Sequence, residues 1–583
     1  MNIKLTDDGA RAYFDGATMA YREMIKIIPG SDWDRKKRQW SIPFASIEDS
    51  KRVFPSITMD DTVLEEYKKF VARNKLALAT KTANASTKVD GLKGNLYDYQ
   101  ARGKAFLDTI GDFEGGILAF DMGLGKSITS LATYMDMRKN GVVDYCLVIC
   151  PSTLKYSTWE KEIKKWSNLE YTVVDGDKTE TVEWDDGTVS KLKGKELRTI
   201  QYAQWQFGSD VIVMNYELFL KDMDILPPID KHWVIVMDEC QRVKNPKAQT
   251  TKNIMEVAKL AGRKILGSGT PLENNIQELW SLVDMCKKGM LGSYFKFTER
   301  YCEKDYFGSV VGVRTELMDE LKAKIAPIMF RMTKKEALMN LPELTVMDYW
   351  VTMTPAQKTL YKTVKEGILE NLATGEFSYL EALAQITRLQ QCVDSPYLLH
   401  EVLGDEKLPI ESGKLNELEN IIKDLDPTKT KFILFSQYKQ MTDILYKWML
   451  DKKLLKAEQI GYIKGGIKAS ETARIQKEFQ EGGVQCVLMT TAGNYGLDLS
   501  AGSYVLCYDE LFNPQKMNQI YSRVHRNGVK QAVTAINIVT RDSYEEKKIA
   551  ILESKKELFK AMVDGDDTAF AKLFTKNDLL KMI

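Results

Sequence analysis

Short runs of apolar residues recur through two stretches of the chain. In the first stretch, from Tyr97 to about Asp284, the runs are GILAF, CLVIC, VIVM, WVIVM and KILGS. Each run is bounded by polar or turn residues and is followed by a helical pattern. Continuous runs of this length are typical of parallel strands that are buried on both faces. The pattern therefore predicts an α/β lobe built on a parallel sheet.

The same pattern returns towards the C-terminus in KFILFS, CVLMTT, YVLCYD and AVTAINIV. Between the two stretches the pattern is mostly helical. Within the first lobe, VEWDDGTV predicts a hairpin that turns at Asp186-Gly187. The predicted boundaries are a first lobe over 96–284, a helical insertion over 285–410, a second lobe over 411–550 and a helical tail over 551–583.

The first 75 residues differ from both lobes. The strings RAYFDG, RQWSIPF and AYREMIKII predict strands and a helix of a small α+β module. Residues 76–95 are rich in Ala, Thr, Ser and Lys, which is a linker composition. We therefore expect the lobes to fold without residues 1–75.

Composition places the chain among globular proteins. Its 583 residues exceed one core and predict three to five domains. No apolar run reaches the ~18–20 residues that span a bilayer, and MNIKLTDDGA lacks a signal-peptide pattern. We expect a cytoplasmic location, in a bacterium or a virus-infected cell. The net charge of +1 means that any nucleic-acid surface is a local patch.

Cysteine and histidine argue against disulfides and a His-based metal site. The eight cysteines show no C-x-x-C spacing, which is typical of reduced thiols, and Cys146 and Cys150 fall on one expected strand. The three histidines, His232, His400 and His525, lie far apart in the sequence.

The string AFDMGLGKSITS places Gly-Lys-Ser at a strand-to-helix turn, the context that a phosphate-binding loop requires. Phe120 stands where the usual G-x-x-x-x-G-K-[ST] has its first glycine. Gly123 and Gly125 would let the backbone approach phosphates closely. Lys126 would reach the β- and γ-phosphates, and the Ser127 hydroxyl would bind Mg²⁺. For this motif alone, a helix-capping Gly/Ser turn is the alternative.

A second motif, HWVIVMDECQRVKN, ends a buried strand in two carboxylates. Asp238 would hold the metal ion, and Glu239 would polarise the attacking water. A strand-end cap is the alternative for a lone Asp-Glu pair. The phosphate-loop pattern upstream favours the catalytic interpretation.

These residues resemble the Swi/Snf-type ATPases of helicase superfamily 2. FDMGLGKS matches the family's D-E-M-G-L-G-K-T, which also lacks the first glycine, and GSGTPLENNIQELWSLVDM is close to T-G-T-P-L-x-N-N-x-x-E-L-W-S-L-L. In the second lobe, TTAGNYGLDLSAGSYVLCYDELFNPQKMNQIYSRVHRNG matches the family's motifs V and VI. The resemblance covers about 95–550. It implies two RecA-like lobes with helical insertions and an ATPase that uses ATP, Mg²⁺ and DNA.

The resemblance also implies a set of site residues. Gln100 would read adenine, and the nucleotide site would include Asp121, Met122, Gly123, Leu124, Gly125, Lys126 and Ser127. DNA contacts would come from Ser152, Thr153, Asn215, Tyr216, Asn274, Ser436, Gln437, Thr490 and Thr491. Ser152 and Thr153 are also natural helix caps, so this segment alone does not decide between the two roles.

Three residues near the end of the second lobe complete the implied catalytic set. Gln519, Arg523 and Arg526 are spaced by four and three residues, so one helix face would present all of them. The two arginines would contact the γ-phosphate as fingers. A surface Arg/Gln helix is the alternative.

The sequence departs from the family at three places. Gln241 replaces a histidine in the Asp-Glu motif, Asp121 stands alone where the family has two carboxylates, and Val529 replaces a glutamine. None of these changes removes a metal ligand or a phosphate contact, so ATP hydrolysis is still expected. They bear instead on how hydrolysis is coupled to the action on DNA.

The N-terminal string FDGATMAYREMIKIIPGSDWDRKKRQWSIPF is similar to the HARP domain of annealing helicases. Trp33 and Trp40 would flank a hairpin tip and stack on unpaired bases. The alternative is that both tryptophans are core residues and that the basic run is a solvated turn. The basic tip consists of Arg35, Lys36, Lys37 and Arg38.

The combined expectation is an ATP-dependent translocase that remodels branched DNA by fork regression, annealing or branch migration, in repair or recombination. Its DNA contacts would be sequence-independent and salt-sensitive. A motor that strips proteins from duplex DNA and an ATP-gated clamp that does not translocate are the alternatives. We expect a monomer with no membrane partner, and single-strand-binding or replication proteins are the protein partners to consider.

Overall fold

The computed structural model divides into two compact units. The first consists of Met1–Lys155 and Trp159–Ala337, and the second of Tyr156–Thr158 and Leu338–Ile583. It describes residues 2–7, 11–16, 19–112, 114–175, 179–183, 188–205, 208–243, 245–246, 248–269, 276–304, 310–337, 342–374, 379–427, 429–491, 497–526, 529, 531–554 and 582.

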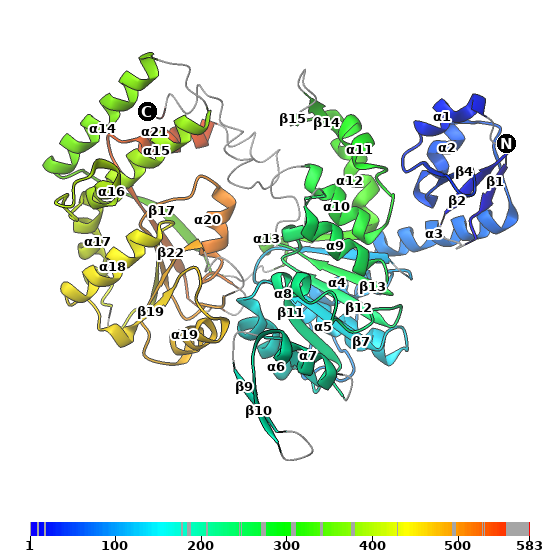
Figure 1. Cartoon of the computed structure of the whole chain (residues 1–583), viewed down its shortest axis with the longest axis horizontal. Coiled ribbons are helices and arrows are strands. Elements are labelled where there is room, and N and C mark those ends of the chain that lie inside the picture. The colour runs from blue at the N-terminus through cyan, green and yellow to red at the C-terminus, as the bar shows by residue number, and fades with distance from the viewer. Residues whose placement is uncertain are drawn as a thin grey trace. The chain divides into compact units, whose positions relative to one another are not determined.

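The first unit is built on a seven-stranded parallel sheet (Figure 1). The strand order is β16-β6-β13-β12-β7-β11-β8. The five predicted apolar runs correspond to β6, β7, β11, β12 and β13, so the predicted α/β fold of this lobe is confirmed. The strands are β6 Glu114–Phe120, β7 Tyr145–Cys150, β8 Tyr171–Val173, β11 Val211–Asn215, β12 Trp233–Asp238, β13 Arg263–Gly267 and β16 Met329–Met332.

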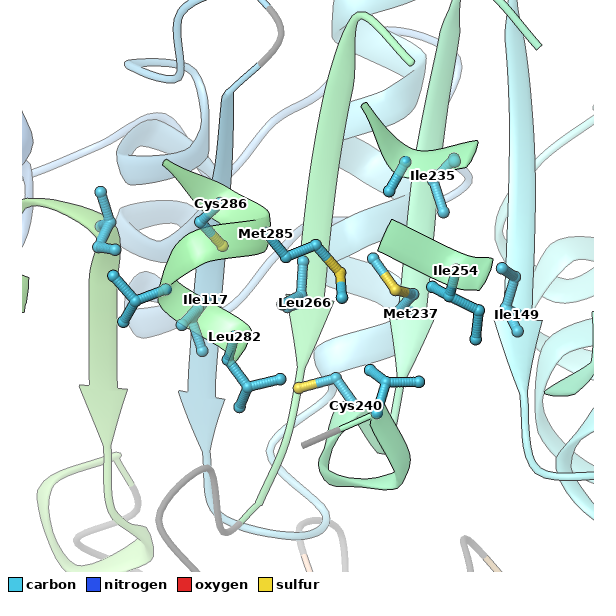
Figure 2. Close-up of a cluster of buried hydrophobic side chains, with 14 of the residues drawn as sticks. Ile117, Ile149, Ile235, Met237, Cys240, Ile254, Leu266, Leu282, Met285 and Cys286 are labelled. Atoms are coloured by element: carbon cyan, nitrogen blue, oxygen red, sulfur yellow. The ribbon is translucent and has the colours of Figure 1, made fainter. Parts of the chain in front are cut away.

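Helices α9 and α10 pack on this sheet through a buried apolar cluster. Figure 2 shows strand side chains such as Ile117, Met237 and Leu266 near Ile254 of α9 and Leu282 of α10. On other elements, α4 packs against α5, and α5 contacts β12 and β13. The helices of this lobe are α4 Asp98–Leu107, α5 Lys126–Lys139, α6 Lys161–Trp166, α7 Gly194–Trp205, α8 Tyr216–Lys221, α9 Gln249–Ala258, α10 Ile276–Cys286, α11 Tyr294–Tyr301, α12 Met318–Ile325 and α13 Lys334–Ala337.

Two antiparallel hairpins extend this lobe. Strands β9 (Glu180–Glu183) and β10 (Val189–Leu192) form the predicted one. Its predicted turn at 186–187 lies outside the described residues. The second hairpin, β14 (Cys302–Lys304) with β15 (Val310–Val313), was not predicted.

The second unit is built on a six-stranded parallel sheet in the order β17-β22-β21-β18-β20-β19. Its strands are β17 Leu344–Val351, β18 Phe432–Phe435, β19 Ile460–Ile463, β20 Cys486–Met489, β21 Tyr504–Cys507 and β22 Val533–Thr540. Its helices are α14 Pro355–Thr374, α15 Tyr379–Asp394, α16 His400–Leu403, α17 Gly413–Asp424, α18 Lys439–Asp451, α19 Ala469–Glu481, α20 Pro514–Tyr521 and α21 Tyr544–Ser554. Of the predicted tail over 551–583, the structure describes the end of α21 and residue 582.

The predicted helical insertion over 285–410 is not one structural element. Its first part, through Ala337, belongs to the first unit and contributes β16, which pairs with β6. Its second part contributes β17, which pairs with β22 of the second unit. β16 has only four residues, and β17 mixes apolar with polar residues, so their sequences did not separate them from the flanking helices.

The N-terminal residues form the predicted α+β module. A sheet in the order β3-β4-β2-β1-β5 packs with two short helices around a small core that includes Ile3, Phe14 and Ile42. The elements are β1 Asn2–Leu5, β2 Ala12–Asp15, α1 Arg22–Lys26, β3 Asp32–Asp34, β4 Gln39–Ile42, α2 Ile47–Val53 and β5 Thr58–Met59.

The predicted linker over 76–95 is folded against the first lobe. Helix α3 (Asp61–Thr80) continues through the expected boundary at residue 75. Directly after it, Lys81 Nζ donates to the carbonyl oxygens of Ala326 and Met329 at 2.6 and 2.7 Å, and burial lowers its pKa to about 8. Further on, Val89 and Leu96 are buried in a cluster with α5. The linker prediction is corrected, because a polar composition does not exclude packing by a few apolar side chains.

The N-terminal module also contacts the first lobe directly. The Lys296 ammonium of α11 donates to the Lys26 carbonyl and to Ser31 Oγ, and a Cβ added at Gly292 would lie 2.9 Å from the Gly30 nitrogen. A deletion of residues 1–75 would therefore cut α3 and expose a packed surface, and we no longer expect it to leave the lobe intact.

All eight cysteines are buried and free of disulfides. Among the described residues, no helix has the length and apolar character needed to cross a membrane.

A buried ion cluster joins four segments of the second unit. Lys414, at the start of α17, is fully buried, and its ammonium donates to Asp394 at 2.9 Å, to Glu545 at 2.6 Å and to the Tyr508 carbonyl at 3.0 Å. Burial raises the pKa of Asp394, and the Lys414 charge opposes this shift. The cluster therefore depends on the single cation at its centre.

We expect Lys414→Ala to lower the free energy of unfolding of the second unit by about 3–5 kcal/mol, because it leaves buried carboxylates uncompensated. Thermal unfolding followed by circular dichroism measures this loss. Lys429→Ala is the matched control: Lys429 forms an exposed ion pair with Asp426, and its loss should cost less than about 1 kcal/mol. Equal melting temperatures for the two variants would contradict the assignment.

Candidate functional site

The phosphate-loop motif lies between β6 and α5, as predicted. Gly125 is the N-cap residue of α5 and has a φ of +79°, a conformation that favours glycine. Lys126 and Ser127 form the first turn of the helix, whose backbone N–H groups have no partner within the helix and can bind an anion. The Lys126 ammonium donates to the Phe120 carbonyl at 3.2 Å, so the lysine folds back over its own loop.

Gln100 holds this loop through hydrogen bonds of its side-chain amide. Its side-chain nitrogen donates to the Leu124 carbonyl at 3.0 Å, and its side-chain oxygen accepts from the Tyr97 backbone N–H at 3.0 Å. Both ends of the amide are thus satisfied within the protein, and the side chain is buried. In this structure Gln100 thus holds the loop, and its role as an adenine reader stays a prediction. The exposed aromatic ring beside it belongs to Tyr97, which stacks on Tyr99.

Asp121, the carboxylate at the start of the phosphate loop, is held by Arg331 of β16 and by Lys334, which lies two positions after the end of that strand. Its oxygens accept from the Arg331 guanidinium and from the Lys334 backbone N–H, each at 2.9 Å. Arg331 also donates to the Gly269 carbonyl at 2.8 Å, which follows β13. Arg331 thereby connects the loop to the neighbouring strand end, and sequence analysis had assigned it no role.

Asp238 and Glu239 lie at the carboxyl end of β12 and are both buried. One Asp238 oxygen accepts from the Glu239 backbone N–H at 3.0 Å. Glu239 has a φ of +51°, a strained conformation for a non-glycine residue that clusters at functional sites. Its carboxylate accepts from the Gln241 amide at 2.7 Å, and Gln241 in turn accepts from Ser268 Oγ at 2.9 Å. Gln241, which departs from the family's histidine, therefore provides a hydrogen-bonded link from Glu239 to the end of β13.

The loop and the carboxylate meet beside Gly267. This glycine ends β13, which lies between β6 and β12 in the sheet. A Cβ added at Gly267 would lie 3.5 Å from Asp238 Oδ1 and 3.6 Å from Lys126 Cδ, so both side chains lie beside this strand end. Hydroxyl and carboxylate oxygens are the donors that Mg²⁺ prefers, and it takes its remaining ligands from water and phosphate. Ser127 and Asp238 therefore fit the predicted Mg²⁺ ligands.

Burial raises the pKa of Asp238 to about 6, the Glu239 charge adds to the shift, and Lys126 opposes it. Asp238 is thus a carboxylate whose charged form depends on a nearby cation.

The predicted DNA contacts of the first lobe fall into two groups. Ser152 is exposed in the turn after β7, where it can face a phosphate, whereas Thr153 is half-buried and its hydroxyl oxygen is buried. Asn215 is buried and donates to Glu217 at 2.7 Å. Tyr216 is buried, and its hydroxyl donates to the Asp238 carbonyl at 2.8 Å. The predicted contact by the Tyr216 side chain is corrected to a packing role, and Asn274 lies outside the described residues.

The predicted DNA contacts of the second lobe divide in the same way. Ser436 is fully buried and donates its hydroxyl to Asp509, whose other oxygen accepts from the Gln437 backbone N–H at 2.9 Å. The predicted phosphate contact by the Ser436 side chain is therefore corrected, because its hydroxyl fixes the strand end. Gln437 is half-buried, Thr490 is buried and Thr491 is exposed, so Thr491 is the accessible threonine.

The predicted shared helix face of Gln519, Arg523 and Arg526 is wrong. Helix α20 ends at Tyr521, so Gln519 is helical while the two arginines lie in the turns that follow. Arg523 is almost fully buried. Arg526 is more accessible and donates to the Leu497 carbonyl at 3.1 Å. Residue spacing alone extended the helix past its end.

The N-terminal hairpin matches its predicted position. Strands β3 and β4 pair Trp33 with Trp40, whose ring centroids lie 5.4 Å apart. Trp40 packs against the module core, whereas Trp33 is 40% exposed, so each tryptophan follows a different one of the two interpretations. The backbone N–H groups of Lys36 and Lys37 donate to the Asp34 carboxylate and fix the turn. The four basic side chains of the tip, Arg35, Lys36, Lys37 and Arg38, are all exposed.

Trp159, in the segment that follows β7, is a further residue of this site, and its side chain is buried. In addition, its indole N–H donates to Asp238 at 3.0 Å. No local pattern reports such a contact, because its two partners are 79 residues apart in the chain.

Comparison with known proteins agrees with the motifs. Residues 36–398 match the family described as the SNF2-related domain, and residues 413–528 match the helicase conserved C-terminal domain. The putative ATP-dependent helicase/translocase YwqA of Bacillus subtilis is 28% identical over 486 residues, which cover 82% of this chain and 49% of that protein. The ISWI chromatin-remodeling complex ATPase ISW1 of Saccharomyces cerevisiae is 27% identical over 513 residues, covering 84% and 43%.

Among solved structures, the Sulfolobus solfataricus SWI2/SNF2 ATPase core in complex with dsDNA is 27% identical, with a TM-score of 0.37 over 85% of this chain and 98% of that chain. The chain spans about half or less of the length of the curated relatives that it matches.

We expect Gly125→Ala to weaken nucleotide binding at least tenfold. The φ of +79° costs a residue with a side chain about 1–2 kcal/mol, and the new Cβ would overlap the Gln100 amide that holds the loop. Titration with a fluorescent ATP analogue measures the effect. Gly141→Ala is the matched control, since Gly141 has a similar φ of +67° with open space around it. Similar nucleotide affinities for both variants would contradict the proposed loop geometry.

Proposed function

Because the chain belongs to the SNF2-related family, we propose that it is an ATP-dependent translocase on duplex DNA that remodels branched structures. One observation carries this proposal. The carboxyl ends of the first-lobe strands present the nucleotide groups at β6, β13 and β12, and the exposed Ser152 follows β7, the next strand in the sheet. A nucleotide site and a candidate phosphate contact thus share one edge of a sheet.

The proposed hydrolysis uses the residues that the first lobe brings together. The start of α5 and the Lys126 ammonium would bind the β- and γ-phosphates. Mg²⁺, held by Ser127 and Asp238, would supply charge neutralisation on the phosphates. Glu239, oriented by Gln241, would accept a hydrogen bond from the attacking water and align it. Arg523 and Arg526 stay the proposed γ-phosphate arginines, with Arg526 favoured because it is the more accessible of the two.

The branched-DNA part of the proposal depends on the N-terminal hairpin. An exposed aromatic ring beside a basic turn is the combination with which proteins bind unpaired bases and their phosphates. Trp33 and the tip 35–38 provide this combination on a module that is docked on the lobe. The resemblance to the HARP domain supports the same assignment.

ATP-driven rewinding of a labelled DNA fork tests the proposal, alongside translocation on single duplex molecules. Rewinding together with translocation would support it. Translocation that removes a bound repressor from duplex DNA but never rewinds a fork would support the protein-stripping motor. ATP-dependent binding with no translocation would support the clamp.

We expect Glu239→Gln to bind Mg·ATP with near-normal affinity and to hydrolyse it about 10²–10⁴-fold more slowly, because Asp238 and the hydrogen bond from Gln241 are both retained. Steady-state phosphate release and nucleotide titration measure the two properties. Glu256→Gln, at an exposed carboxylate of α9, is the control and should behave like the unmodified chain. A parallel loss of nucleotide affinity in Glu239→Gln would show that the two carboxylates do not divide their roles in this way.

Neutralising the hairpin tip should weaken fork binding and reduce its salt dependence. We suggest Arg35→Gln, Lys36→Gln, Lys37→Gln and Arg38→Asn together, since Arg38 has a φ of +54° that asparagine tolerates. Loss of up to four phosphate contacts would reduce the slope of log K against log [salt] by up to about 3. Binding to forked and linear duplex DNA at several salt concentrations measures the slope.

The matched control replaces Lys51 and Arg52, two basic residues of α2 in the same module, by glutamine. It should leave the slope unchanged. If the tip variant and the control rewind forks equally well, the module serves as a scaffold and the protein-stripping motor becomes the better proposal.

A further inference from the structure

A single hydrogen bond links the chain segment after β7 to the predicted metal ligand. The Trp159 indole N–H donates to Asp238 Oδ2 at 3.0 Å, and both side chains are buried. We propose that Trp159 is a positioning residue that orients the Asp238 carboxylate for Mg²⁺ and couples it to the DNA-contact segment.

The chemistry of the pair makes this link specific. Indole has one N–H donor and no acceptor, so the direction of the bond is fixed. The other Asp238 oxygen, Oδ1, accepts from the Glu239 backbone N–H, so the carboxylate is restrained at both oxygens. Each carboxylate oxygen accepts more than one bond, which leaves capacity for a metal ion. Outer partners of this kind fix the orientation of a metal ligand.

The position of Trp159 in the chain supplies the second part of the proposal. Ser152 and Thr153, the candidate phosphate contacts, lie shortly after β7. The chain then forms a π-helical turn, Lys155–Glu160, that carries Trp159. π-Helical turns are rare in proteins, and those that occur are often found at functional sites. Only six residues therefore lie between the exposed Ser152 and Trp159, whose indole holds Asp238.

The base of this turn is fixed to the lobe. Lys155 is buried, and its ammonium donates to the Val174 carbonyl at 3.1 Å and lies 3.4 Å from Asp175. Ser152 lies three residues before this fixed base, and Trp159 lies near the other end of the turn. We expect a DNA phosphate bound at Ser152 to restrain this segment and, through it, the Trp159 indole. DNA binding would thereby adjust the geometry of the metal ligand.

The inference rests on the proposed function, since it takes Asp238 as the metal ligand and Ser152 as a DNA contact. The test uses the full chain with Trp159→Phe, which keeps an aromatic ring but removes the donor. The affinity for fluorescent mant-ADP is measured against free Mg²⁺ and again in EDTA, and the ATPase rate is measured with and without duplex DNA. We expect Trp159→Phe to need about 10- to 100-fold more free Mg²⁺ for half-maximal binding, with unchanged affinity in EDTA and reduced stimulation by DNA.

Three further proteins make the outcome decisive. Trp166→Phe, at the end of α6, is the matched control and should keep the Mg²⁺ requirement of the unmodified chain. Asp238→Ala tests the site itself: if it binds mant-ADP with a normal Mg²⁺ requirement, the metal-ligand assignment fails, whatever Trp159 does. Benzothienylalanine at position 159 keeps the shape of indole without its N–H and replaces Trp159→Phe if that variant does not fold. A Mg²⁺ requirement within twofold of normal in the Trp159 variant, with Asp238→Ala impaired, would overturn the proposal.

Discussion

The parallel order of one sheet is the constraint on which the first lobe depends. Parallel strands end at the same edge, so segments that are distant in sequence meet there without any special connection. The phosphate loop follows β6 and Asp238 ends β12, with β13 alone between them. Two strand spacings amount to about 10 Å. The Lys126 side chain spans part of that distance across the end of β13, where Gly267 has no side chain and lies beside both Lys126 and Asp238.

Around this edge of the sheet, hydrogen bonds and an ion pair connect the polar groups of neighbouring strand ends. Gln100 holds the loop, Arg331 joins Asp121 to Gly269, and the link from Glu239 through Gln241 reaches Ser268. In a buried environment, such mutual hydrogen bonds restrict each member to one orientation. These hydrogen bonds would hold the groups that we propose for catalysis in place before nucleotide binds, so little reorganisation would remain for the binding step.

The sequence predicted the parts that depend on local patterns. Apolar runs predicted the central strands of both sheets, and the Gly-Lys-Ser and Asp-Glu motifs predicted the loop and the strand-end carboxylates. It failed where the outcome depends on contacts between distant segments. Tyr216 and Ser436 stand in motif positions, yet their hydroxyls are used by buried partners, Asp238 and Asp509. The contacts of Arg331 and Trp159 could not be predicted from local sequence, because their partners come from other strands. The predicted helix through Arg526 was too long, because residue spacing does not show where a helix ends, and α20 ends at Tyr521.

Helix α3 joins the N-terminal module to the first lobe with no break in twenty residues. An α-helix turns by about 100° and rises 1.5 Å for each residue. Inserting one residue into α3 would thus swing the whole module around the helix axis and separate Gly30 from Gly292. Seven inserted residues would nearly restore the orientation but displace the module by about 10 Å. The length of α3 therefore fixes both the rotation and the distance of the N-terminal module relative to the first lobe. Natural variation in length between the module and the lobe would be confined to loops on either side of α3, where added residues do not rotate one part against the other.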